Sequence, residues 1–120
     1  MSDNVFKNQP SLRALLKAGK PVLGSWLQAS SPCIAEIFAN AGYRWMGLDV
    51  EHTSASYELV ESVARAAYGR GADLLVRVSQ ADQIEIRRCL DCGAQGVIVP
   101  YIESAEQAQK AVAAAKYPPV

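Results

Sequence analysis

The sequence has few of the residues from which disulfide-linked and metal-centred proteins are built. Histidine occurs once and cysteine three times in 120 residues, and an odd number of thiols fits free cysteines in a reducing compartment better than a disulfide framework. Cys89 and Cys92 form a C-x-x-C, but no second Cys or His pair lies nearby, which disfavours a zinc or redox role. We interpret them as two small residues near the end of a helix.

Long apolar runs and net charge are also missing. The longest apolar stretches, such as residues 96–99, have the length of a strand and fall far short of the ~20 residues that span a bilayer. Residues 1–7 contain no apolar signal core. Twelve Lys and Arg balance twelve Asp and Glu, so no net field attracts phosphate backbones or anionic lipids. We therefore expect a cytoplasmic protein that binds neither nucleic acid nor membrane.

What the sequence does contain is a regular alternation of strand-length and helix-like segments. Apolar runs at residues 21–27, 45–50, 73–78 and 95–101 predict strands, and helical spacing between them is typical of a parallel sheet. A short helix over residues 11–18 precedes the first strand. The predicted helix faces are Ile34, Ile37, Phe38 and Ala41; Leu59, Val60, Val63, Ala64 and Ala67; Ile84 and Leu90; and Ala105, Ala108, Val112 and Ala115.

Capping signals support these boundaries. Ser31 before Pro32 predicts a capping hydroxyl, residues 82–85 and 104–107 resemble capping boxes, and Gly42, Gly71 and Gly93 stand where helices should end. Four βα units can form a small doubly wound domain or half of an eight-unit barrel, which needs about 250 residues. Composition does not separate these two architectures.

Chemically useful side chains follow the predicted strands. Asp49, Glu51 and the single histidine, His52, come at the end of the second strand, and Arg77 lies in the apolar third strand. Ligands of parallel α/β folds gather at the carboxyl ends of strands. The alternatives are a solvent-facing loop for His52 and a buried ion pair with Asp49 or Glu51 for Arg77. Either way, a base beside a fixed cation suits proton abstraction from a hydroxyl with stabilisation of an oxyanion.

The ordered motifs resemble those of the HpcH/HpaI aldolases. Residues 42–52, G-Y-R-W-M-G-L-D-V-E-H, resemble the family's G-F-D-W segment that leads to D-x-E-H. Residues 75–78 resemble its V-V-R segment, and residues 90–100 resemble its L-L-D-x-G stretch, which leads to a strand ending in proline. Residues 24–26 and 116–119 are weaker matches. The similarity runs in order from about residue 6 to residue 120.

This resemblance implies a (β/α)8 TIM barrel of the phosphoenolpyruvate/pyruvate type, a class II aldolase acting on pyruvate or a related 2-oxo acid and an aldehyde. It implies His52 as catalytic base, Arg77 as the residue that binds the pyruvate oxygens, and Asp49 and Glu51 as support. Asp91 matches the aspartate that pairs with the histidine. Because its predicted helix returns to the amino end of the barrel, Asp91 would reach His52 from a neighbouring subunit of a homo-oligomer.

The sequence also departs from the family pattern. Val50 replaces a frequent Gly, and Thr53 and Ser54 replace Ala-Pro. The family uses a divalent metal such as Mg, Mn or Co, and its Glu and Asp ligands come from later strands, so no metal ligand is named in this chain. We expect residues 1–120 to be a partial barrel domain, the amino-terminal half, truncated before the metal-ligand strands and inactive by itself.

Two other functions remain open. A flavodoxin-like binding or signalling module fits the length, but the first strand lacks an acidic cluster and no G-x-G-x-x-G appears. An enolate-handling lyase of the citrate-lyase-β type would keep the barrel and change the chemistry.

Overall fold

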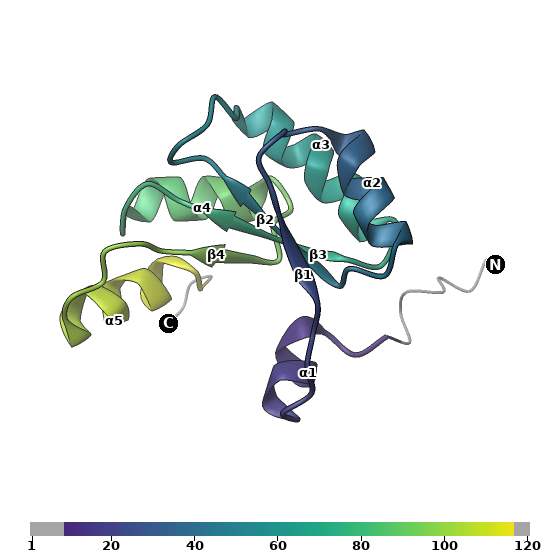
Figure 1. Cartoon of the computed structure of the whole chain (residues 1–120). Coiled ribbons are helices and arrows are strands. Elements are labelled where there is room, and N and C mark those ends of the chain that lie inside the picture. Colours follow the sequence, from purple (N-terminus) through teal and green to yellow (C-terminus); the bar gives the residue numbers. More distant parts are fainter. Residues whose placement is uncertain (1–8, 117–120) are drawn as a thin grey trace.

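The computed structural model describes residues 9–116 (Figure 1), which form a four-stranded parallel sheet and five helices. Strands and helices alternate after an initial helix, as the apolar pattern predicted. The strands are β1 (Gly24–Leu27), β2 (Trp45–Asp49), β3 (Asp73–Arg77) and β4 (Gly96–Ile98). The helices are α1 (Leu12–Lys17), α2 (Pro32–Asn40), α3 (Tyr57–Tyr68), α4 (Gln83–Asp91) and α5 (Ala105–Ala114).

The order of the strands decides between the two predicted architectures. The sheet runs β1-β2-β3-β4, and each strand pairs in parallel with the next one along the chain. Right-handed crossovers that always advance by one strand place the connecting helices on the same face of the sheet. A doubly wound sheet instead reverses its strand order at a switch point. The sheet therefore has the arrangement of a barrel segment.

One face of this sheet forms the core with the helices. Met46 and Leu48 of β2 and Leu74 and Val76 of β3 are fully buried, as are Val60 and Val63 of α3. A buried Val or Leu side chain contributes about 1.5–3 kcal/mol relative to an exposed one. The core therefore holds the two central strands against α3.

On the opposite face, large side chains lie over glycines of the neighbouring strand. Gly24 pairs in register with Trp45, and a Cβ at residue 24 would lie 1.9 Å from Trp45 Cε2. Gly47 pairs with Trp26, whose Cε3 would lie 2.8 Å from a Cβ at residue 47. These glycines are required by close packing. The face itself is incompletely covered, since 42% of Trp26 is exposed.

Helix α1, predicted over residues 11–18, lies beyond the amino end of β1 (Figure 1). The Ser11 side chain accepts from Ala14 N, and Leu12 N donates to Asp73 Oδ2 at 3.1 Å. Within residues 9–116, none of the helices has the length and apolar character needed to cross a membrane.

The predicted helix ends are largely confirmed, with three corrections. Gly42, Gly71 and Gly93 follow helices at φ of 100°, 82° and 101°, conformations that favour glycine. The Ser31 side chain makes no capping hydrogen bond. Asp82 and Ser104 do cap α4 and α5, but neither capping box closes on the capping residue. Glu85 instead accepts from Ser79 N, and Gln107 accepts from Glu103 N.

Three predicted helix faces were partly wrong. Ile84 of α4 is 68% exposed, whereas Ile86 and Cys89 are buried. Ile37 of α2 is 60% exposed, and Ala35 occupies the core position instead. Val112 of α5 is 54% exposed, whereas Ala111 and Ala114 are buried. In α2 and α5 the large side chains had suggested a buried face. The buried core positions of these helices are instead occupied by alanine.

Strand β4 ends earlier than predicted, at Ile98 rather than Tyr101. Pro100 lacks an N–H for the ladder, and Tyr101 adopts φ 59°, which is incompatible with an extended strand. The chain therefore leaves the sheet before Tyr101.

Candidate active site

Three adjacent strands hold the guanidinium of Arg77 at the carboxyl edge of the sheet. Arg77 Nε donates to Asp49 Oδ1 at 3.2 Å, and Arg77 Nη2 donates to Asp49 Oδ2. Asp49 ends β2 and is the direct register partner of Arg77 in β3. The Trp26 ring of β1 lies on another side, with 5.0 Å between Arg77 Cζ and the ring centroid. Arg77 is thus fixed by a carboxylate and an aromatic ring.

Asp49 also organises the loop that follows its strand. Its Oδ1 accepts from Glu51 N at 2.9 Å and from His52 N at 3.2 Å, while its carbonyl accepts from the Thr53 hydroxyl. Asp49 is only 3% exposed. The hydrogen bond from Arg77 lowers the pKa of Asp49, with the two backbone N–H groups adding to this and burial opposing it. Its carboxylate is therefore held ionised.

Glu51 connects the fixed cation to the histidine. Glu51 Oε2 lies 3.3 Å from His52 Nε2 and 3.7 Å from Arg77 Nε. The Glu51 side chain is 11% exposed, whereas that of His52 is 61% exposed. The residues predicted to lie together, Asp49, Glu51, His52 and Arg77, therefore do so. The two structural alternatives named from the sequence also fit this geometry, because Arg77 forms an ion pair with Asp49 and the His52 side chain is mostly exposed.

Tyr101 and Trp26 also join this cluster, although the sequence did not identify either as a site residue. Interaction with the Glu51 carboxylate raises the pKa of Tyr101. The sequence feature that could have identified them is their position at strand ends. Trp26 lies near the carboxyl end of β1, and Tyr101 follows β4 by three residues. Aromatic residues at strand ends are common in cores, so position alone did not distinguish them.

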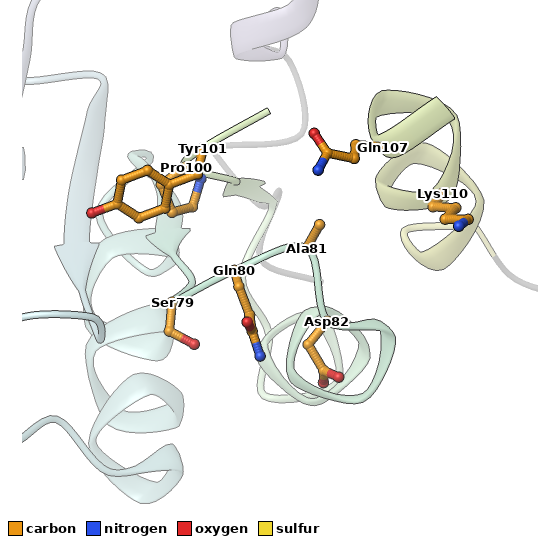
Figure 2. Close-up of a pocket in the computed structure, with 8 residues that line it drawn as sticks. All are labelled: Ser79, Gln80, Ala81, Asp82, Pro100, Tyr101, Gln107 and Lys110. Atoms are coloured by element: carbon orange, nitrogen blue, oxygen red, sulfur yellow. The ribbon is translucent and has the colours of Figure 1, made fainter. Parts of the chain in front are cut away.

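A cleft of about 640 Å³ opens beside this cluster (Figure 2). The loop after β3, the loop after β4 and the first turns of α5 line it. Figure 2 shows the Tyr101 ring turned away from Gln107 and Lys110, with its hydroxyl pointing out of the cleft. The lining residues are Ser79, Gln80, Ala81, Asp82, Pro100, Tyr101, Gln107 and Lys110.

Asp91 lies at the other edge of the sheet. It is the last residue of α4, which leads to the amino end of β4, whereas His52 follows the carboxyl end of β2. All four strands are parallel, so these two ends lie at opposite edges. The chain therefore does not bring Asp91 to His52 within one subunit.

The described residues do not fit a divalent cation. Within residues 9–116, no group of three or more His, Cys, Asp or Glu side chains is arranged to hold a metal ion. The carboxylates of Asp49 and Glu51 already face the guanidinium of Arg77, whose charge would repel a metal bound beside them.

The C-x-x-C residues are free thiols in a poor setting for redox chemistry. Cys89 is fully buried, and burial raises its pKa to about 11. Burial also raises the pKa of Cys92. Because the thiolate is the reactive form, both residues are chemically quiet at neutral pH.

Comparison with known proteins decides the family. The model of the family described as HpcH/HpaI aldolase/citrate lyase matches residues 23–120. The chain belongs to this family. It is 39% identical over 109 residues to the 4-hydroxy-2-oxo-heptane-1,7-dioate aldolase of Shigella sonnei, a match that covers 91% of the chain.

Two solved structures that are similar to this chain share its fold. The HpcH/HpaI aldolase from Desulfitobacterium hafniense superposes with a TM-score of 0.85 at 36% identity, over 92% of this chain and 43% of that one. Citrate synthase SbnG gives a TM-score of 0.85 at 32% identity, over 92% of this chain and 45% of that one. The predicted half of a TIM-barrel architecture is confirmed, and a flavodoxin-like module is not favoured.

The chain spans less than half of the proteins it matches. The similarity to the Shigella sonnei aldolase covers 42% of that protein's length.

Proposed function

We propose that this chain supplies the proton-transfer and carboxylate-binding side of a metal-dependent aldolase, which cleaves a 4-hydroxy-2-oxo acid to pyruvate, or a related 2-oxo acid, and an aldehyde. The observation that carries the proposal is the fixed cation Arg77 beside the Glu51–His52 pair at the carboxyl edge of the sheet. Aldolase-named relatives support the reaction class.

Arg77 would bind the acidic end of the substrate. Its contacts with Asp49 use Nε and Nη2, and a guanidinium has five N–H donors in all, so donors remain for a substrate oxygen. Its side chain is 30% exposed, which leaves the guanidinium accessible. The positive charge then offsets the negative charge that develops on the enolate.

His52 would accept the proton of the substrate's 4-hydroxyl. The Glu51 carboxylate lies beside Nε2 and favours the proton on that nitrogen, which leaves the Nδ1 lone pair to act as base. Removal of the hydroxyl proton forms the aldehyde carbonyl as the C3–C4 bond breaks. The electron pair of that bond passes to C3 of the departing 2-oxo acid as an enolate, which is later protonated.

The metal would be held elsewhere. We propose that residues 1–120 act as one partial barrel domain and that ligands for Mg²⁺, Mn²⁺ or Co²⁺ come from outside it. Likewise, we propose that Asp91 reaches His52 only across a subunit interface of a homo-oligomer. The three free thiols support a reducing, cytoplasmic location.

A fusion protein tests the proposal. Residues 1–120 are joined to the part of the Shigella sonnei aldolase that follows its matched region, and pyruvate release from a 4-hydroxy-2-oxo acid is measured with each metal. We expect turnover by the fusion and none by residues 1–120 alone. Arg77→Lys and His52→Asn should each lower kcat/KM by about 100-fold, because each removes a directed contact.

Arg65→Lys is the matched control, since Arg65 forms only an exposed ion pair with Glu61 on α3. A fusion with a native-like circular dichroism spectrum that releases no pyruvate with any of the three metals would overturn the proposal. So would an Arg77→Lys variant as active as Arg65→Lys.

Citrate chemistry is the second candidate. The family description includes citrate lyase, and one structural neighbour is named citrate synthase SbnG. Incubating the fusion with citrate instead of a 4-hydroxy-2-oxo acid, and identifying the products by mass spectrometry, distinguishes the two reactions.

A further inference from the structure

Large side chains and glycines alternate along one row of residues across the sheet. Trp26 of β1 pairs in register with Gly47 of β2, Gly47 with Leu75 of β3, and Leu75 with Gly96 of β4. A Cβ at residue 47 would lie 2.8 Å from Trp26 Cε3, and a Cβ at residue 96 would lie 2.8 Å from Leu75 Cδ2. Each large side chain therefore lies over the glycine of the next strand.

Gly47 gives the indole of Trp26 a path across β2. Trp26 belongs to β1 and Arg77 to β3, so β2 separates the two residues. The centroid of the Trp26 ring nevertheless lies 5.0 Å from Arg77 Cζ. A side chain at residue 47 would take the place of the indole, because its Cβ would lie 3.1 Å or less from three ring carbons. The contact between Trp26 and Arg77 therefore depends on a glycine in the strand between them.

Burial explains only part of this placement of the ring. Trp26 is 42% exposed, so much of the indole gains nothing from removal of apolar surface from water. A guanidinium over the face of an aromatic ring is attracted to it electrostatically, and Trp gives the strongest attraction. Arg77 therefore provides the specific contact that the exposed indole makes.

Asp49 and Trp26 hold different parts of the guanidinium. Asp49 accepts hydrogen bonds from Nε and Nη2 of Arg77, which form one edge of the planar group, and the Trp26 ring supports the group at Cζ. Nη1 takes part in neither hydrogen bond. The edge formed by Nη1 and the second N–H of Nη2 has the geometry to donate two parallel hydrogen bonds to a carboxylate.

We propose that Trp26 is a positioning residue for substrate binding, which lies across Gly47 and holds the Arg77 guanidinium so that its free Nη1–Nη2 edge receives the carboxylate of the 2-oxo acid. The proposal rests on the proposed function for the identity of the acid, but not for the contact between Trp26 and Arg77. Trp26 acts through Arg77 and takes no part in proton transfer.

The contact is tested first, without any activity measurement. Nuclear magnetic resonance of the ¹⁵N-labelled 120-residue chain observes the Nε–H group of Arg77, which is assigned as the signal missing from Arg77→Lys. The ring current of an indole shifts the signals of groups that lie over its face, so Trp26→Leu should move the Arg77 signal. Trp26→Phe keeps a smaller ring and should move it less. An Arg77 signal unchanged in Trp26→Leu would overturn the proposal.

Trp45→Leu is the matched control for loss of an indole. Trp45 also lies over a glycine, Gly24, but it pairs in register with Asp73 at the opposite end of β3 from Arg77. This variant should leave the Arg77 signal in place. If it moves the signal as far as Trp26→Leu does, the shift reports a general change in packing and the positioning role is wrong.

The path across β2 is tested by Gly47→Ala, which keeps Trp26 but places a methyl group where the indole lies. It should move the Arg77 signal in the same direction as Trp26→Leu. Gly96→Ala is its control, because the added methyl group meets Leu75 instead of Trp26, and it should leave the signal unchanged. Equal shifts in the two alanine variants contradict the role of Gly47.

Kinetics of the fusion protein complete the test. Trp26→Leu should raise KM for the oxo acid about tenfold and change kcat less than about threefold, because a displaced Arg77 loses binding in the ground state as well as in the transition state. Trp45→Leu should leave KM unchanged. An active fusion whose KM is unaffected by Trp26→Leu overturns the positioning role. A fusion that is inactive in every form contradicts the proposed function, and the resonance results then decide the contact between Trp26 and Arg77.

Discussion

Asp49 and Arg77 face each other directly across β2 and β3. They are register partners at the carboxyl ends of the two strands, and Arg77 donates to both carboxylate oxygens of Asp49. Asp49 is 3% exposed and also accepts two backbone N–H groups of the following loop. One carboxylate therefore fixes both the cation of the candidate site and the loop that carries His52.

Replacing Asp49 should destabilise the chain. Asp49→Asn keeps an oxygen for the two backbone donors but turns a neutral amide toward Arg77, so the ion pair is lost. We expect the free energy of unfolding, measured by urea denaturation, to fall by about 2 kcal/mol. Glu61→Gln, which breaks the exposed pair with Arg65, is the control and should cost less than about 0.5 kcal/mol. Equal losses in both variants would contradict this account.

The contribution of Asp49 should depend on pH in one direction. Its pKa in the folded chain is lowered below the ordinary 3.8, mainly by the hydrogen bond from Arg77. A carboxyl with a lowered folded-state pKa stabilises the protein well above its unfolded pKa and loses this effect as the pH falls toward the folded value. The difference in unfolding free energy between the natural chain and Asp49→Asn should thus be constant from pH 7 to about 5 and shrink toward pH 3. If the difference in unfolding free energy between the two proteins instead grows as the pH falls, the predicted role of the Asp49 carboxylate is wrong.

Gly24 should not tolerate a side chain beside Trp45. An added Cβ would lie 1.9 Å from Trp45 Cε2, so the indole or the strand must move. We expect Gly24→Ala to lower the free energy of unfolding by about 1–3 kcal/mol. In a Trp45→Leu background the same change should cost less than about 0.5 kcal/mol, since the clash is gone. Additive losses in the double variant would show that the two residues are not coupled.

Cys33 and Cys89 should react with iodoacetamide in a fixed order. Cys33 is exposed, whereas Cys89 is buried with its pKa raised to about 11. At pH 8 the folded chain should be alkylated first at Cys33, with Cys89 labelled only after urea is added, as followed by peptide mass spectrometry. In Cys33→Ser, early labelling should nearly vanish. Labelling of Cys89 in the folded chain as fast as that of Cys33 would contradict the buried assignment.

Local signals in the sequence predicted most of the elements correctly. Strand-length apolar runs separate helical segments, and glycine follows the ends of α2, α3 and α4 because it alone readily adopts positive φ there. Helix faces were less predictable. Large residues such as Ile37 and Val112 suggested buried positions, but α2 and α5 pack through Ala35, Ala111 and Ala114. Hydrophobic periodicity predicts that a helix has a buried face, but tertiary packing decides which residues of the helix are buried.

The sequence by itself determined the residue types of the site and the edge of the sheet on which Asp49, Glu51, His52 and Arg77 lie, because parallel strands end at a common edge. Only the tertiary structure decided how they are paired. The register sets Asp49 against Arg77, and the Trp26 ring lies on the Arg77 guanidinium, so these contacts join the ends of three different strands. Such contacts depend on strand alignment and loop conformation, which short-range patterns do not specify.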